Sequence, residues 1–190
     1  MFKSLIDKYP LYASALIFGG LGAINSFLYF FFLIAFKMYP FSGVYFITFI
    51  INALFIVISI WYFRYLLNNY VFHFWQALSV GIAANLIQTF IYCAIVAGFI
   101  SSFAPDFLQV YIDVEQQKFL LDKPVFIANI SESQFNEMLK SIEQISMSDI
   151  IIRLGKINGS IGIIVVLIAS MLLRRKEILE SPLNTPPTKK

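Results

Sequence analysis

The side chains in this sequence that could do chemistry are few and scattered. His73 is the single histidine and Cys93 the single cysteine, and no second cysteine or histidine exists to complete a ligand set with either. A metal site needs three or four such ligands at characteristic spacings, and a nucleophile needs a base beside it. We therefore expect no enzyme activity, no metal and no cofactor, with Cys93 serving as a packing residue.

Carboxamides inside long uncharged runs are the other polar groups of interest. Amides buried in such runs can line a path for a neutral solute or a lipid headgroup, or they can join helices by hydrogen bonds. We predict interhelical polar contacts and keep the polar lining as the alternative. Three of the amides should lie near mid-depth and the last near one end of its run. The five residues are Asn25, Asn52, Asn85, Gln88 and Asn158.

The elements that must position these amides are membrane-spanning helices. The chain has 190 residues, of which 59% are hydrophobic and 13% charged, unlike a soluble domain. Four uncharged runs approach or exceed the roughly 17 to 25 residues that a helical span needs. They predict an all-α, polytopic fold with a single membrane domain over residues 1–190. The first run is predicted to be an anchor that is retained and not a cleaved signal. The spans are about 11–36, 41–63, 74–103 and 157–173.

The charges outside the runs predict the orientation, and their absence inside the runs excludes some functions. Ion-coupled carriers, proton pumps and voltage sensors normally keep ionisable groups at membrane depth, and these runs have none. Basic flanks favour the cytoplasmic side, so both termini are predicted to be cytoplasmic. His73 falls in an aromatic belt with Trp61 and Trp75 at the same face. The residues on the predicted cytoplasmic side are Lys3, Lys8, Arg64, Arg174, Arg175, Lys176, Lys189 and Lys190.

The segment of about residues 104–150 is predicted to be extracytoplasmic and to form two amphipathic helices over the outer mouth of the bundle. Pro105 and Asp106 mark the start of the first, and Ser131 with Gln134 forms a capping box at the start of the second. The second helix carries an apolar stripe that packs on the spans or docks a partner. The stripe consists of Phe135, Met138, Leu139, Ile142 and Ile145. The tail, about 181–190, is predicted to be disordered.

The arrangement resembles a bacterial membrane-protein family, domain of unknown function 4199. The resemblance rests on the entry segment "FHFWQALSVGIAANLI", the segment "APDFLQVY", a charged amphipathic helix before the last span, and "LLRRKE" after it. It covers roughly residues 10–177. Trp75 and Leu78 depart from relatives, which often have a glycine and a second aromatic in the entry segment. The resemblance implies a bacterial inner membrane and brings no established activity, cofactor or site residue.

Two functions are compatible with these observations. The first is a non-catalytic accessory or scaffold subunit of an inner-membrane protein complex, with lipid and other membrane subunits, or copies of itself, as partners and no role for nucleic acid. It is favoured by short polar loops, small residues spaced for close helix contact, and one amphipathic helix outside the membrane. The alternative is a small carrier or flippase-like protein for a neutral or lipid-linked substrate.

Overall fold

The computed structural model describes residues 8–40, 45–66, 72–127 and 131–174, and over these residues the chain is helical. This confirms the predicted all-α fold. The predicted disordered tail lies outside the described residues. The helices are α2 (Pro10–Ala35), α3 (Phe46–Leu66), α4 (Phe74–Phe103), α5 (Phe107–Leu121), α6 (Lys123–Ile127), α7 (Glu132–Glu143) and α8 (Met147–Leu173).

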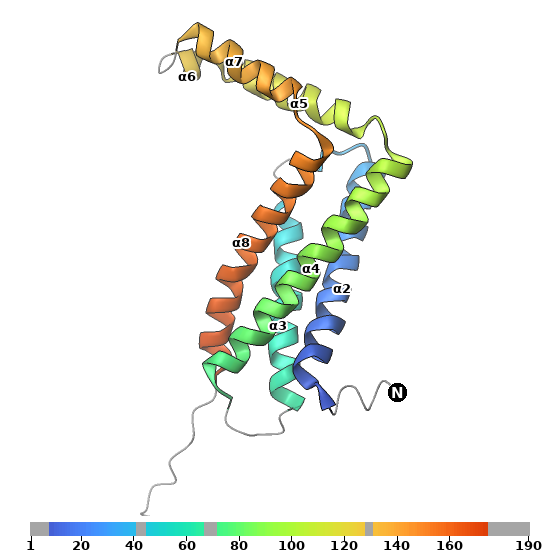
Figure 1. The fold of residues 1–190 in the computed structure, drawn as a ribbon, viewed down its shortest axis with the longest axis vertical. Coiled ribbons are helices and arrows are strands. Elements are labelled where there is room, and N and C mark those ends of the chain that lie inside the picture. The colour runs from blue at the N-terminus through green and yellow to red at the C-terminus, as the bar shows by residue number, and fades with distance from the viewer. Residues whose placement is uncertain (1–7, 41–44, 67–71, 128–130, 175–190) are drawn as a thin grey trace, which may run out of the picture.

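Four of these helices, α2, α3, α4 and α8, are long and apolar enough to cross a membrane, and they pack side by side as a bundle (Figure 1). The most extensive contacts join α4 to α2 and to α8, while α3 packs against all three. At 1.5 Å per residue, the 30 residues of α4 measure roughly 45 Å, more than a hydrocarbon core of roughly 30 Å. The protein is therefore a multi-pass membrane protein in which α4 tilts or protrudes.

The helix that contains the last predicted span begins before that span, because α8 starts at Met147, ten residues ahead of Ile157. Ser146 caps this start: its Oγ accepts from the backbone N–H of Asp149 at 3.4 Å, and Asp149 Oδ2 accepts from the backbone N–H of Ser146 at 2.9 Å. Arg153 therefore lies on a helix continuous with the membrane span, and not in a loop ahead of it.

Small residues let α2 and α4 come together closely. Ala15, Gly19 and Ala23, which share one face of α2, are all buried. A Cβ placed on Gly19 would lie 2.8 Å from the backbone carbonyl oxygen of Ala84 on α4. The glycine is required here because a backbone oxygen cannot rotate away as a side chain can.

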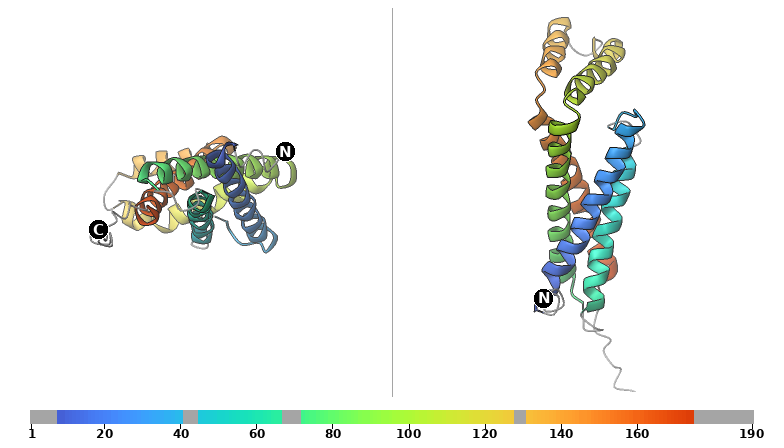
Figure 2. Two further views of the ribbon diagram at one scale, coloured as in Figure 1. Left: turned by 90° about the horizontal axis from the view of Figure 1, so that it is seen from below. Right: turned by 90° about the vertical axis from the view of Figure 1, so that its right-hand side faces the viewer.

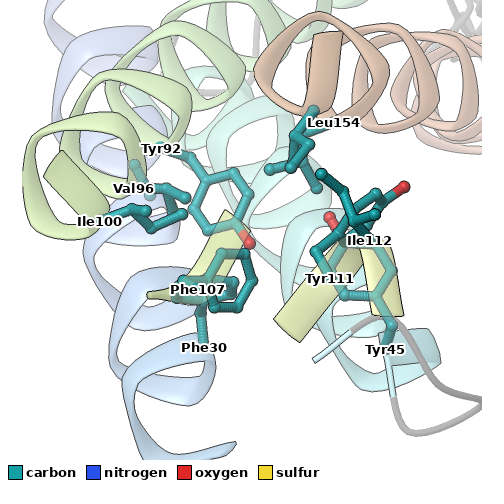
Figure 3. Packing of buried hydrophobic residues seen from close by; sticks show 11 residues of the cluster. Phe30, Tyr45, Tyr92, Val96, Ile100, Phe107, Tyr111, Ile112 and Leu154 are labelled. Atoms are coloured by element: carbon teal, nitrogen blue, oxygen red, sulfur yellow. The ribbon is translucent and has the colours of Figure 1, made fainter. Parts of the chain in front are cut away.

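The core of the bundle consists of two apolar clusters, one near each end. The cluster toward the end where α2 and α4 finish is shown in Figure 3, and includes Phe30, Tyr92 and Leu154. The second cluster, toward the opposite end, includes Ile60, Phe72 and Val166 among its buried members. Both clusters bury large side chains from several helices, so burial holds the helices together at both ends.

Helices α5, α6 and α7 form a hairpin at one end of the bundle (Figure 2), which we call the helical hairpin. The base of α5 is buried in the first apolar cluster through Phe107, Tyr111 and Ile112. Beyond this base, α5 packs mainly against α7 and α6 rather than against the long helices. The two predicted helices are present, and α7 is clearly amphipathic whereas α5 is not. The hairpin contacts the bundle at its base and does not lie flat over the end of the bundle.

Candidate functional site

The centre of the bundle contains a network of buried amides with Asn52 as its hub. The Oδ1 of Asn52 accepts hydrogen bonds from Ser26 Oγ at 2.7 Å and from Gln88 Nε2 at 2.6 Å. Its Nδ2 donates to Asn158 Oδ1 at 2.8 Å. These three bonds connect α3 to α2, α4 and α8, so one side chain joins all four long helices.

Two further bonds extend the network along the bundle. The Nδ2 of Asn158 also donates to the hydroxyl of Tyr45 at 3.0 Å, and Asn85 Nδ2 donates to the backbone carbonyl of Gly159 at 3.0 Å. Asn85 packs so tightly against α8 that a Cβ on Gly162 would collide with its side chain. The amides therefore fix how the helices are positioned along one another as well as how they are rotated.

The prediction of an interhelical contact is wrong for Asn25. Its side chain is exposed, and its Nδ2 donates to the carbonyl of Leu21, one turn earlier in the same helix, at 2.9 Å. Ser26, the next residue, faces the core and makes the contact instead. An amide that bonds its own backbone satisfies a donor without a neighbouring helix.

Asn158, predicted to lie near one end of its run, is level with Asn52, because α8 begins before that run. On α8 it lies between Leu154 of the first apolar cluster and Val166 of the second. Asn52 on α3 lies in the same way between the two clusters. Tyr45, just before α3, belongs to the first cluster, and Ile56, further along α3, belongs to the second. The network is thus a polar layer between two apolar ones.

A small cavity lies between the hairpin base and α8, close to the end of the amide network. It has a volume of about 110 Å³, and we call it the vestibule. Glu115 and Arg153 contribute its charges, with Arg153 donating to the Tyr111 hydroxyl at 2.8 Å and lying 3.9 Å from Glu115 Oε2. Its lining residues are Tyr45, Tyr111, Glu115, Ile150, Arg153, Leu154 and Ile157.

Glu115 also ties the hairpin to the link between α2 and α3. Its Oε1 accepts from the Tyr39 hydroxyl at 3.1 Å and from Lys118 Nζ at 3.1 Å. Burial, followed by the negative charge of Glu115, raises the pKa of the Tyr39 phenol well above its usual value. Burial likewise raises the pKa of Tyr111, although the nearby Arg153 opposes this rise.

We predict from this environment that Tyr39 stays protonated at pH 11. A phenol with an ordinary pKa of about 10 would be roughly 90% ionised at that pH. Because the phenolate is disfavoured in the folded state, any stability linked to Tyr39 is present below pH 10 and is lost as the pH rises above it. The measurement is phenolate absorbance of the wild type minus that of Tyr39→Phe, with the fold monitored by circular dichroism. A difference equal to one ionised phenol at pH 11 would contradict the expected protection.

The apolar stripe of residues 135–145, expected either to pack on the spans or to dock a partner, is largely covered by the chain itself. Phe135 is 1% exposed and stacks on Phe119 with ring centroids 4.7 Å apart. Ile142 and Ile145 are partly buried against the first apolar cluster. Leu139 is half-buried and Met138 is 44% exposed. At Phe135 the cover is α5, which is neither a span nor a partner, whereas partner docking at the exposed Met138 stays a prediction.

Replacing Phe135 by alanine is expected to loosen the hairpin while leaving the bundle folded. The buried ring contacts both Phe119 and Phe126, and truncating a buried phenylalanine typically costs about 3 to 5 kcal/mol. Hydrogen exchange followed by mass spectrometry should show lost protection over residues 131–143 and unchanged protection in α4. Met138→Ala on the same helix is the control. Equal exchange in the two variants would show that the ring does not hold the hairpin.

The remaining sequence candidates occupy structural positions. His73 is exposed and precedes α4, where its backbone N–H donates to Gln76 Oε1 at 3.0 Å. Trp75 and Trp61, 71% and 54% exposed, belong to the same end of the bundle, as expected for rings at a membrane surface. Cys93 is half-buried and faces Gly155 of α8. No group of three or more potential metal ligands occurs among the residues that the structure describes.

Sequence reasoning missed Ser26 and Tyr45 as members of the network. Ser26 could have been found, because it continues the small-residue face of Gly19 and Ala23 at helical spacing. Tyr45 gives no comparable signal, since its hydroxyl reaches Asn158 only through the folding of distant segments.

Comparison with known proteins matches the chain to a family model. No curated protein and no solved structure matches the chain. The family model described as "Protein of unknown function (DUF4199)" matches residues 14–175, which include all but the first four residues of α2, the other three long helices and the hairpin. The predicted resemblance is thus confirmed, and the chain belongs to the DUF4199 family of proteins of unknown function.

Proposed function

We propose that the protein is a non-catalytic accessory or scaffold subunit of an inner-membrane protein complex. In this proposal both termini are cytoplasmic and the helical hairpin lies on the opposite side of the membrane. The observation that carries it is the amide network, in which Asn52 is hydrogen-bonded to Ser26, Gln88 and Asn158. These groups hold the helices of the bundle to one another.

The burial of the amides favours a scaffold over a carrier. Gln88 and Asn158 are each 2% exposed, and Asn85 is 3% exposed. A carrier for a polar solute would have to break these bonds and open the bundle before the amides could contact its substrate. A scaffold needs the opposite property, because a rigid framework holds its contact surfaces in place.

The tip of the hairpin offers a surface on which a partner subunit could dock. Leu121 is 80% exposed, Val125 is 68% exposed and Leu120 is 49% exposed, although the segment lies beyond the long apolar helices. Exposed apolar side chains grouped outside the membrane are typical of protein contact surfaces. The hairpin base is anchored in the bundle, so the tip is held at a defined position.

Affinity purification tests the proposal. A tagged chain extracted in mild detergent is expected to copurify with the same membrane proteins, in a fixed ratio, in repeated preparations. The double variant Leu121→Ser/Val125→Ser should lose them, whereas Glu137→Ser, an exposed substitution on α7, should keep them. Repeated recovery of the chain alone would count against a scaffold.

Transport by the isolated protein would support the carrier instead. If proteoliposomes containing the pure chain moved a neutral or lipidic substrate, and Asn85→Leu stopped that movement without unfolding, the scaffold proposal would fail. A reporter fused after Lys190 tests the orientation separately. Activity of a reporter that works only in the cytoplasm is the expected result.

A further inference from the structure

A second cavity lies at the hairpin end of the bundle, between the segment after α2 and the corner that joins α4 to α5. Its volume is about 510 Å³. One wall comes from the segment after α2, including Lys37 and Pro40, and the other comes from the α4–α5 corner and the first turns of α5. Its lining residues are Ile34, Lys37, Met38, Tyr39, Pro40, Phe103, Ala104, Pro105, Asp106, Phe107, Val110 and Val114.

The cavity lies at the ends of two helices that are long and apolar enough to cross a membrane, and the end of a spanning helix is where lipid headgroups are met. It begins where α2 and α4 end, at Ala35 and Phe103. Phe36 and Phe103 beside it are 64% and 78% exposed, as expected of side chains that contact lipid. A ligand in this cavity would have its polar part between the segment after α2 and the α4–α5 corner. Its apolar part would lie along the exposed ends of α2 and α4.

Two opposite charges face the cavity without neutralising each other. Lys37 and Asp106 come from different walls, and neither forms an ion pair within 4.0 Å in the described part of the chain. Asp106 occupies the capping position of α5, yet its side chain makes no capping hydrogen bond. Its carboxylate is therefore available to an external donor, and the Lys37 ammonium is available to an external acceptor.

Lys37 is held in a conformation that a lysine rarely adopts. It has φ 55°, the left-handed region that favours glycine, and it follows the end of α2. Its N–H donates to the carbonyl of Ile34 at 2.9 Å, and the N–H of Met38 donates to that of Leu33 at 2.8 Å. A glycine would relieve the strain at this position, so the positive charge of Lys37 comes at the expense of local stability.

We propose that this cavity binds the headgroup of a zwitterionic phospholipid that carries phosphoethanolamine. The phosphate contacts the Lys37 ammonium, the ethanolamine ammonium donates to the Asp106 carboxylate, and the acyl chains follow the exposed surfaces of Phe36 and Phe103. A lipid with only a negative headgroup leaves Asp106 unpaired. A choline headgroup, which has no N–H, cannot donate to it.

Native mass spectrometry of the delipidated full-length protein tests this assignment. Phosphatidylethanolamine, phosphatidylcholine and phosphatidylglycerol with identical acyl chains are added separately, and the fraction of protein that retains one lipid is measured under equal activation. The expected result is at least five-fold greater retention of phosphatidylethanolamine than of the other two. Equal retention of all three, or preference for phosphatidylglycerol, would overturn the proposal.

Variants separate loss of the site from loss of the fold. Lys37→Gly should reduce retention of phosphatidylethanolamine at least five-fold while the melting temperature without lipid stays equal or rises, because the left-handed backbone is relieved. Asp106→Asn should remove the preference over phosphatidylcholine, and Val110→Trp should fill the cavity and lower retention of every lipid. Glu137→Gln, on α7, is the matched control. Wild-type retention by both Lys37→Gly and Asp106→Asn would refute the role of the charge pair.

Discussion

Gly19→Ala is expected to destabilise the bundle by about 1 to 3 kcal/mol, the usual cost of an added methyl group in a packed core. The new Cβ would lie 2.8 Å from the carbonyl oxygen of Ala84, so α2 and α4 must separate. That separation would disturb neighbouring contacts along the most closely packed faces of the bundle. The measurement is the free energy of unfolding in detergent, followed by circular dichroism.

Gly20 provides the control for this prediction, since it is the next residue of the same helix and receives the same substitution. A Cβ on Gly20 would meet nothing within 4 Å. Alanine also favours a helix over glycine by up to about 1 kcal/mol, so Gly20→Ala should be neutral or stabilising. If the two variants unfolded alike, close backbone approach would not explain the small-residue face of α2.

Asn52→Leu should lower the free energy of unfolding by about 2 kcal/mol. It removes three interhelical hydrogen bonds, each of which contributes about 0.6 kcal/mol on average in membrane bundles. It also leaves the partner groups on Ser26, Gln88 and Asn158 buried without their common acceptor or donor. The loss should appear as unfolding at lower denaturant in detergent, with an unchanged helical content before the transition.

The same substitution at Asn25 isolates the contribution of the network. Asn25 is exposed and bonds only one turn back, to Leu21, so Asn25→Leu removes an equal amide without removing an interhelical contact. Its unfolding is expected to match that of the wild type within about 0.5 kcal/mol. If the free energy of unfolding of Asn52→Leu were equal to or above that of Asn25→Leu, the network would have no structural role.

The spans could be predicted from the sequence because lipid excludes charge. Which face of each helix points to the core and which to lipid could not be predicted. In a soluble helix the polar face marks the solvent, whereas here both the lipid face and the core face are apolar. Composition therefore locates Asn25 and Asn52 within spans without showing that the first faces outward and the second inward. Only packing against the neighbouring helices distinguishes them.

The start of α8 was missed for a related reason. Asp149, Arg153 and Lys156 indicate a segment outside lipid, which is compatible with either a loop or a protruding helix. The capping box of Ser146 and Asp149 was a readable signal for the helix. In the hairpin, the corresponding box of Ser131 and Gln134 did predict the start of α7.

The vestibule and the burial of Phe135 could not be predicted, because both depend on contacts between segments that are distant in the sequence. Glu115 contacts Tyr39 and Arg153, which belong to separate elements of the chain. The periodicity of the stripe on α7 predicts an apolar face, but it does not show which segment packs against that face. Here the cover is Phe119 of α5, a residue that also fits the apolar pattern of its own helix.

The continuous course of α8 gives the hairpin a mechanical connection to the membrane interior. Arg153 holds Tyr111 at the hairpin base, and Asn158, five positions further on, holds Asn52 in the polar layer. At 1.5 Å per residue, roughly 7.5 Å of rigid helix separates these two attachments. A pull on the hairpin by anything bound to it would therefore be transmitted along α8 to the centre of the bundle as a displacement of the helix axis.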